Sequence, residues 1–235
     1  MTPSIRLHVT AALSEGAEVP ATPGQAHYLG AVMRRGAGDT VLLFNGRDGE
    51  WRAHIGALRK DRGHFVVEAQ TRTQAPEPDL WLVFALLKRD ATDLVVEKAT
   101  ELGASRIVPV FTERTNAGRV NGERLTAIAA EAAEQCERLG VPTIAEPQRL
   151  ATLLQSWPAE RRLVVAAERA DAPPICPGSG PDALLIGPEG GFTPLELDLL
   201  CRHPFVRQAS LGPRILRAET AAIVGLALLQ AGRDG

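Results

Sequence analysis

The chain has 235 residues, with 26 Lys and Arg against 28 Asp and Glu, so its formal charge at pH 7 is −2. A hydrophobic content of 45% with 23% charged residues is ordinary for a globular protein with a sizeable core, and it excludes disordered, collagen-like and coiled-coil chains. The longest apolar run, Ala221 to Leu229, is far shorter than the ~20 residues of a membrane-spanning helix. Without a secretory-signal layout, and with three cysteines far apart, we expect a cytoplasmic protein with reduced thiols.

Short strands separated by turns dominate the first 72 residues. Thr40–Phe44 is a β-prone run closed by Asn45-Gly46, a strong hairpin signal, and two more strand-like runs follow at 51–58 and 64–71. The segment from Gly24 to Arg35 predicts one short helix. Together these patterns predict a small β-barrel-like module over residues 1–72.

A stiff connector is expected at residues 73–79, where two prolines bracket a glutamate. Beyond it, over residues 80–235, strand-like and helix-like segments alternate, which is typical of an α/β domain with a mostly parallel sheet. The expected strands are 80–87, 107–111, 161–167, 182–186 and 205–211, and the expected helices are 91–102, 123–139, 194–201 and 218–231. Because the last helix is apolar all round, we expect it to be buried in a deep core or against a second subunit.

The most informative stretch runs from Leu185 to Glu196. A strand is followed by a Gly/Pro turn and then by a helix with Thr193 at its N-cap, Pro194 at its first position and Glu196 at its third, the pattern of a capping box. Glycines in the turn let the backbone approach a ligand closely. The turn is therefore either a ligand site at the carboxyl end of a strand or simply a tight strand-to-helix connection.

A second Gly-Pro loop, Leu211 to Thr220, again joins a strand to a helix. Glu219 complements the dipole at the helix start, whereas Arg214 and Arg217 are unfavourable there without an anion nearby. That anion is either a carboxylate, Glu189 or Glu219, or a phosphate.

Other familiar sites have no support. The histidines lack metal-ligand spacing, so we expect no metal. The dinucleotide-binding, P-loop and nucleophile-elbow motifs are also missing from the sequence. Arg34 and Arg35 could contact phosphates, with solvated loop ends as the alternative.

Two motifs identify a resemblance. Ile-Gly-Pro-Glu-Gly-Gly at 186–191 and Leu-Gly-Pro-Arg-Ile-Leu-Arg-Ala-Glu-Thr-Ala at 211–221 resemble the RsmE-type ribosomal RNA methyltransferases of the SPOUT superfamily. Segments 98–103, 112–114 and 132–138 also match that family's pattern, as do 27–34 and 44–46. At the start, Arg6 is retained, but the aromatic residues that usually follow it are replaced by Leu7-His8-Val9.

The resemblance implies an N-terminal PUA-like β-barrel that binds RNA, and a C-terminal SPOUT α/β domain with a parallel sheet and a deep trefoil knot. It implies a homodimer that transfers a methyl group from S-adenosylmethionine to N3 of a uridine in small-subunit (16S) ribosomal RNA. The expected cofactor-binding residues are Ala166, Ala167, Glu168, Leu185, Ile186, Gly187, Pro188, Glu189, Gly190, Gly191, Leu211, Gly212, Ile215, Leu216 and Arg217.

Uracil N3 carries a proton, so transfer requires removal of that proton or stabilisation of the N3 anion. We expect Arg217 to stabilise the developing negative charge or bind the phosphate, with Glu189 or Glu219 positioning it or assisting proton loss. Arg6, Arg34 and Arg35 are the expected RNA contacts. Two alternatives stay open: a non-catalytic RNA-binding protein with a decayed methyltransferase fold, and a nucleotide-dependent metabolite enzyme.

Overall fold

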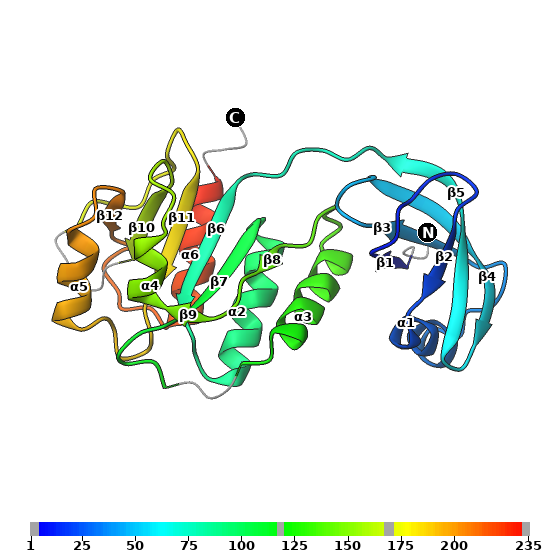
Figure 1. The fold of residues 1–235 in the computed structure, drawn as a ribbon, viewed down its shortest axis with the longest axis horizontal. Coiled ribbons are helices and arrows are strands. Elements are labelled where there is room, and N and C mark those ends of the chain that lie inside the picture. Colours follow the sequence, from blue (N-terminus) through cyan, green and yellow to red (C-terminus); the bar gives the residue numbers. More distant parts are fainter. Residues whose placement is uncertain (1–4, 117–119, 167–171, 232–235) are drawn as a thin grey trace. The chain divides into compact units, whose positions relative to one another are not determined.

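The computed structural model describes residues 5–116, 120–166 and 172–231. The chain forms two compact units, shown in Figure 1. Unit 1 comprises Met1–Pro76 together with Ala133–Val141, and unit 2 comprises Glu77–Ala132 and Pro142–Gly235. The short segment 133–141 therefore belongs with the N-terminal strands, although almost all its sequence neighbours belong to unit 2.

Unit 1 is built on a five-stranded sheet in the order β1-β3-β4-β5-β2. β1 pairs with β3 in parallel, and the other pairings are antiparallel. The three strands expected from the sequence are confirmed, whereas the two edge strands gave no sequence signal. The strands are β1 Arg6–His8, β2 Glu18–Ala21, β3 Thr40–Phe44, β4 Glu50–Arg59 and β5 Arg62–Arg72.

The predicted helix over residues 24–35 is wrong in its second half. Helix α1 (Pro23–His27) begins with a capping box between Thr22 and Gln25, and the chain then widens into one π-helical turn, η1 (Tyr28–Val32). Gly30 in this turn lies so close to β4 that an added Cβ would contact Leu58 at 3.4 Å. The wider turn interrupts the regular helix that was expected across the segment.

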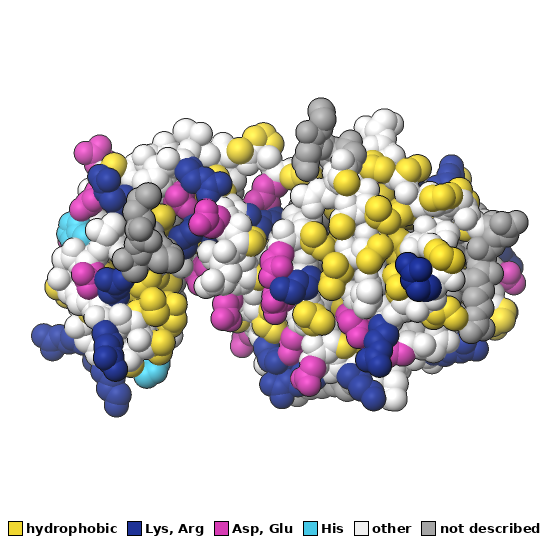
Figure 2. Space-filling model, turned by 180° about the vertical axis from the view of Figure 1, so that it is seen from behind, with side chains coloured by type: hydrophobic (Ala, Val, Ile, Leu, Met, Phe, Trp, Pro, Cys, Tyr) yellow, Lys and Arg dark blue, Asp and Glu magenta, His cyan; other side chains and the backbone are white. Residues whose placement is uncertain are grey.

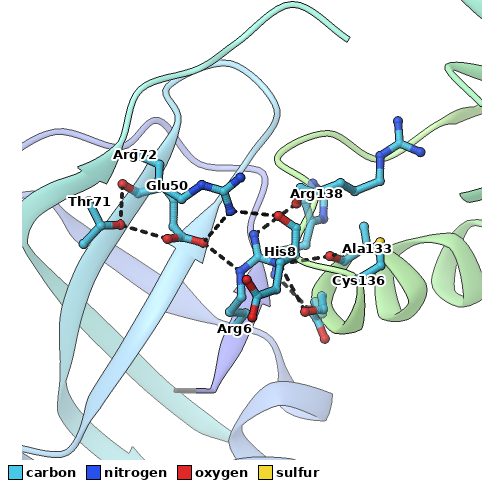
Figure 3. Close-up of polar contacts among 10 residues, drawn as sticks. Arg6, His8, Glu50, Thr71, Arg72, Ala133, Cys136 and Arg138 are labelled. Carbon is cyan, nitrogen blue, oxygen red and sulfur yellow. Dashed lines mark hydrogen bonds and ion pairs between the residues drawn. The ribbon is translucent and has the colours of Figure 1, made fainter. Parts of the chain in front are cut away.

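A buried ion pair lies at the centre of the polar contacts in Figure 3. The Arg6 Nε–H donates to Glu50 Oε2 at 2.7 Å, and both side chains are only 5% exposed. Arg6 also donates to the carbonyl oxygens of Ala133 (2.9 Å), Glu134 (3.1 Å) and Arg138 (3.0 Å). A buried guanidinium is tolerated here because a carboxylate and three carbonyls satisfy its donors.

These carbonyls explain why helix α3 (Gly122–Gln135) ends before the predicted Leu139. A cation is favourable at a helix C-terminus, where the last carbonyls have no partner within the helix. After the helix, Glu137 adopts a left-handed φ of 61°, and its carbonyl accepts from Arg72 at 2.8 Å. The helix therefore ends where side chains of unit 1 bind its carbonyls.

Unit 2 is built on a parallel sheet in the order β12-β10-β11-β6-β7-β8, with β9 also pairing with β7. Every pairing is parallel, which confirms the α/β fold with a parallel sheet. The short strands β8 and β9 were not predicted. The strands are β6 Leu80–Ala85, β7 Arg106–Phe111, β8 Thr143–Ile144, β9 Gln148–Arg149, β10 Arg162–Ala166, β11 Asp182–Ile186 and β12 Val206–Ala209.

Helix α6 packs directly on this sheet. Gly225 lies against β11, where an added Cβ would come within 2.6 Å of Leu184 Cδ2, so only glycine permits this approach. Leu226 and Leu229 are fully buried, but Leu228 is 41% exposed, so the core of this chain does not cover every side of the helix and burial against a second subunit stays a prediction. The other helices are α2 Arg89–Glu101, α4 Leu150–Gln155 and α5 Pro194–Cys201, with α6 spanning Ala218–Gln230. No helix in the described ranges is long and apolar enough to span a membrane.

Replacing Glu50 by Gln tests the buried pair. The substitution leaves the Arg6 cation buried without its counter-charge, so the free energy of unfolding should fall by about 3 kcal/mol, measured by urea denaturation. Glu68→Gln is the matched control, since Glu68 pairs with Arg52 at 2.9 Å on the surface and should change stability little. Equal losses in the two variants would contradict the role given to the buried pair.

Candidate functional site

Three connections leave the same edge of the unit 2 sheet side by side. β10 pairs with β11 on one side and with β12 on the other, and all three strands run in parallel. Their carboxyl ends, Ala166, Ile186 and Ala209, therefore lie at one edge, and each is followed by a segment singled out in the sequence. The carboxyl edge of a parallel sheet is the usual position of a ligand site.

The loop after β11 is a tight glycine turn. The Gly191 N–H donates to the Pro188 carbonyl at 2.8 Å, and Gly191 has a φ of 67°, which strains any residue with a Cβ. An added Cβ on Gly187 would contact the Phe192 ring at 3.0 Å. Glu189 and Gly190, at the tip of this turn, are exposed, so polar backbone groups are accessible to a ligand there.

The helix after this turn starts as the sequence predicts. The Thr193 hydroxyl accepts from the Glu196 N–H at 3.3 Å, and Glu196 Oε2 accepts from the Thr193 N–H at 2.9 Å, completing the capping box. The other carboxylate oxygen of Glu196 accepts from the Glu113 N–H at 2.9 Å. Glu196 is 8% exposed and therefore joins the loop after β11 to the loop after β7.

Arg114 also reaches the glycine turn from the loop after β7. Its guanidinium donates to the Gly190 carbonyl at 2.7 Å, and its stem lies 3.4 Å from where a Gly190 Cβ would be. The sequence gave Arg114 no role in the site. The available signal was its position just beyond a strand of the same sheet.

The loop after β12 completes the group. Gly212 has a φ of 113°, and the Ser210 backbone pairs with Pro173 and Ile175, which follow β10 in the sequence. The connections after β10 and β12 therefore run side by side. Arg217 is the N-cap of α6 and its side chain makes no capping hydrogen bond.

Two of the three predicted catalytic residues, Glu189 and Arg217, lie on these connections, and Glu219 lies in the first turn of α6. Arg217 and Glu189 are exposed and Glu219 is half-buried. Within the described ranges, none of these side chains forms an ion pair or hydrogen bond, and the same is true of Arg214. The sequence left open whether Arg214 and Arg217 pair with a carboxylate of the protein. No such ion pair is present in the described part of the chain, so both guanidinium groups can bind an anion.

The apolar residues among the expected cofactor-binding residues differ in exposure. Leu185 belongs to the core of unit 2 and is 0% exposed, and Ile186 is 3% exposed, so these two side chains are occupied by packing within the protein. Leu211 and Leu216 are half-buried, and Ile215 is 58% exposed. Ala166 is half-buried at the end of β10, whereas the predicted contacts Ala167 and Glu168 lie outside the described residues.

The three predicted RNA contacts differ in their exposure. Arg6 is 7% exposed, and its N–H groups donate to Glu50 and to carbonyls at the end of α3. It therefore stabilises unit 1 and is not available to RNA. Arg34 is exposed and Arg35 half-buried in unit 1. In the residues the structure describes, no three His, Cys, Asp or Glu side chains are grouped to hold a metal ion.

Gly191→Ala tests the geometry of the glycine turn. A Cβ at a φ of 67° should destabilise unit 2 by about 1–2 kcal/mol, measured by thermal or urea unfolding. Gly180→Ala is the control, because an added Cβ at Gly180 meets open space and should be tolerated. Unfolding of Gly191→Ala indistinguishable from that of the unsubstituted protein would contradict the strained turn.

Comparison with known proteins assigns the family. A family model described as an RNA methyltransferase domain matches residues 74–230, and one described as an RNA methyltransferase PUA domain matches residues 22–68. Ribosomal RNA small subunit methyltransferase E of Rickettsia conorii is 34% identical over 94% of this chain and 93% of its own length.

Two solved structures superpose over nearly the whole chain. The methyltransferase Lpg2936 of Legionella pneumophila, in complex with SAM, is 30% identical with a TM-score of 0.87, and each chain is covered to 98%. Ribosomal RNA small subunit methyltransferase E of Neisseria gonorrhoeae, bound to S-adenosyl methionine, is 26% identical with a TM-score of 0.84, covering 97% of this chain and 98% of that one. With a family model matching most of its length, this chain belongs to the RNA methyltransferase family, with a PUA domain at its N-terminus.

Proposed function

We propose that this chain is an S-adenosylmethionine-dependent methyltransferase that methylates N3 of one uridine in small-subunit (16S) ribosomal RNA. The observation that carries the proposal is the convergence of three loops at the carboxyl edge of β10, β11 and β12 in a chain of this family. The relatives named small subunit methyltransferase E and the neighbours bound to S-adenosyl methionine support the same reading. A ribosomal substrate would place the activity in the cytoplasm.

The residues at the sheet edge fit this cofactor. Gly187, Gly190 and Gly191 leave three positions of the turn after β11 without a side chain, so backbone N–H and carbonyl groups there can hydrogen-bond to the edge of an adenine ring. Exposed Ile215 and half-buried Leu216 can cover the ring from the neighbouring loop. The cofactor, when bound, supplies an activated methyl group on a sulfonium.

The protein's own groups must then prepare the nucleophile. Holding the uracil N3 in line with the methyl group supplies the orientation. Arg217 is free to stabilise negative charge on the uracil oxygens or to bind the phosphate. Glu189 in the turn after β11 and Glu219 in the first turn of α6 are the candidates for accepting the N3 proton or positioning Arg217.

The domain division follows from the same proposal. Residues 1–72 form the PUA-like RNA-binding domain, 73–79 the linker and 80–235 the SPOUT methyltransferase domain with a trefoil knot. The chain after β10 runs beside Ser210 in the loop after β12, an arrangement that supports threading of these loops. Exposed apolar side chains of unit 2, Leu195 (72%), Ile215 (58%) and Leu228 (41%), support a homodimer.

The direct test is transfer of labelled methyl from S-adenosylmethionine to small ribosomal subunits that lack this modification, with the labelled nucleotide mapped. We expect label in a single N3-methyluridine. Label at another atom or nucleotide would contradict the proposed target. If the chain binds the cofactor but transfers no methyl group, the proposed target RNA is wrong. If it does not bind the cofactor, the alternative of a non-catalytic RNA-binding protein is favoured.

Arg217→Ala tests the catalytic arginine. Loss of one group that stabilises developing charge should lower kcat about 100- to 1000-fold, while the dissociation constant of S-adenosylmethionine changes little. Methyl transfer to subunits and calorimetric cofactor titration measure the two quantities. Arg202→Ala removes an exposed arginine at the far end of α5 and should leave both unchanged. Normal transfer by Arg217→Ala would remove Arg217 from the mechanism.

A further inference from the structure

Unit 1 carries a surface hollow that the proposed reaction does not use. It has a volume of about 370 Å³ and lies between the α1–η1 segment and the end of β4. His27 and Gly30 contribute to one wall, Leu58, Arg59 and Lys60 to the other, and Arg35 lines it from the loop after η1. This volume is within the range that holds small ligands and suits one nucleotide.

The charge in and around the hollow is uncompensated. Arg35, Arg59 and Lys60 line it and Arg34 is adjacent in sequence, yet in the described part of the chain none of these four has an acidic partner. The acidic groups nearest in sequence form no ion pair with these four residues, although Asp39 lies beside Gly36, which lines the hollow. Asp39 accepts from the Gly36 N–H at 2.8 Å, and Asp61 lies 3.7 Å from Arg62. The site therefore attracts an anion.

Arg35 has a buried N–H group that lacks a hydrogen-bond acceptor among the described residues. Its Nε is buried and has no hydrogen-bond partner, while the side chain as a whole is only half-buried. A buried N–H without an acceptor is costly, and a phosphate or base carbonyl in the hollow would supply one. Surface arginines without a ligand are normally solvated instead.

Apolar side chains stand beside the charges. η1 and the residue after it expose Tyr28 (36%), Val32 (60%) and Met33 (38%). Figure 2 shows Lys and Arg side chains at the end of unit 1 that carries these elements, next to a hydrophobic area. These three side chains do not line the hollow, but the exposed ring of His27 does, beside Arg35 and Lys60, and unpaired bases stack on aromatic rings in such a setting.

The backbone at Arg34 is strained. Arg34 has a φ of 53°, in the left-handed region that residues with a Cβ rarely adopt, and it directly follows the π-helical turn. Both features occur preferentially at functional sites. The Arg35 N–H donates to the Leu29 carbonyl at 2.8 Å, so Arg34 ends the turn in a position that glycine would fit better.

We propose that this hollow binds one nucleotide of a single-stranded RNA segment, with its phosphate on Arg35 and Lys60 and its base against His27. The inference rests on the proposed function, because it identifies how the N-terminal domain holds the ribosomal RNA. A single strand fits better than a duplex, since only an unpaired base can enter a hollow and stack on an aromatic ring.

The test uses the full chain and a fluorescently labelled ten-residue oligouridylate, titrated at several salt concentrations. In the double variant Arg35→Gln/Lys60→Gln the dissociation constant should rise at least about fivefold. The slope of log K against log salt should become shallower by about 1.4, at about 0.7 for each lost phosphate contact on a single strand. Unlabelled duplex RNA should compete poorly.

The matched control is Arg52→Gln/Arg62→Gln, which removes the same charge from unit 1. Both arginines are exposed (52% and 86%) and ion-paired, and neither lines the hollow, so oligouridylate binding should hardly change. If both double variants bound oligouridylate equally weakly, the effect would come from net charge alone, and the proposed site would be overturned. Unchanged binding in the hollow variant, no oligouridylate binding by the unsubstituted chain, or effective competition by the duplex would also overturn it.

Methyl transfer to ribosomal subunits, measured in parallel, separates the two proposals. The hollow variant should show a raised KM for subunits with kcat and S-adenosylmethionine affinity retained. If the unsubstituted chain transfers no methyl group but its oligouridylate binding follows the expected pattern, the proposed function fails and the RNA site stands.

Arg34→Gly adds a further readout. The variant should melt no lower than the unsubstituted chain, because glycine adopts the left-handed φ without strain, yet it should bind the oligouridylate more weakly. Undiminished binding by Arg34→Gly would count against the site.

Discussion

Parallel pairing of β10 with both β11 and β12 is the constraint on which the candidate site depends. It brings three connections that are distant in sequence to one edge of the sheet, and each supplies a different component. The turn after β11 offers glycine backbone, the loop before α6 offers unpaired arginines, and the chain after β10 runs beside the latter. An antiparallel strand at any of these positions would have sent its connection to the opposite edge.

Unit 1 depends on a different interaction, the buried pair of Arg6 and Glu50. Because the guanidinium also binds carbonyls at the end of α3, it determines where that helix stops and makes the following segment part of unit 1. A residue predicted to contact RNA is thus a structural one. Burial explains the change, since a charge removed from water must be satisfied inside the protein.

Two groups of arginines in this chain contrast in their partners. Arg161 and Arg162 pair with Asp79 and Asp182, as Arg6 pairs with Glu50, and they stabilise strand ends and helix ends. The exposed arginines at Arg217 and near the unit 1 hollow have no such partners among the described residues. This division separates charges that serve folding from charges available to a polyanion, and it gives both units a group that RNA could engage.

The sequence by itself determined the longer strands, the alternation of strands and helices in unit 2, the capping box at Thr193, the two glycine loops and the family resemblance, because these depend on local preferences and short motifs. It could not determine the end of α3, the π-helical turn at Tyr28, the contact of Arg114 with Gly190, or which arginines are free. Those features depend on contacts between residues far apart in the chain. Only tertiary structure decides which charge is buried and paired and which is left for a ligand.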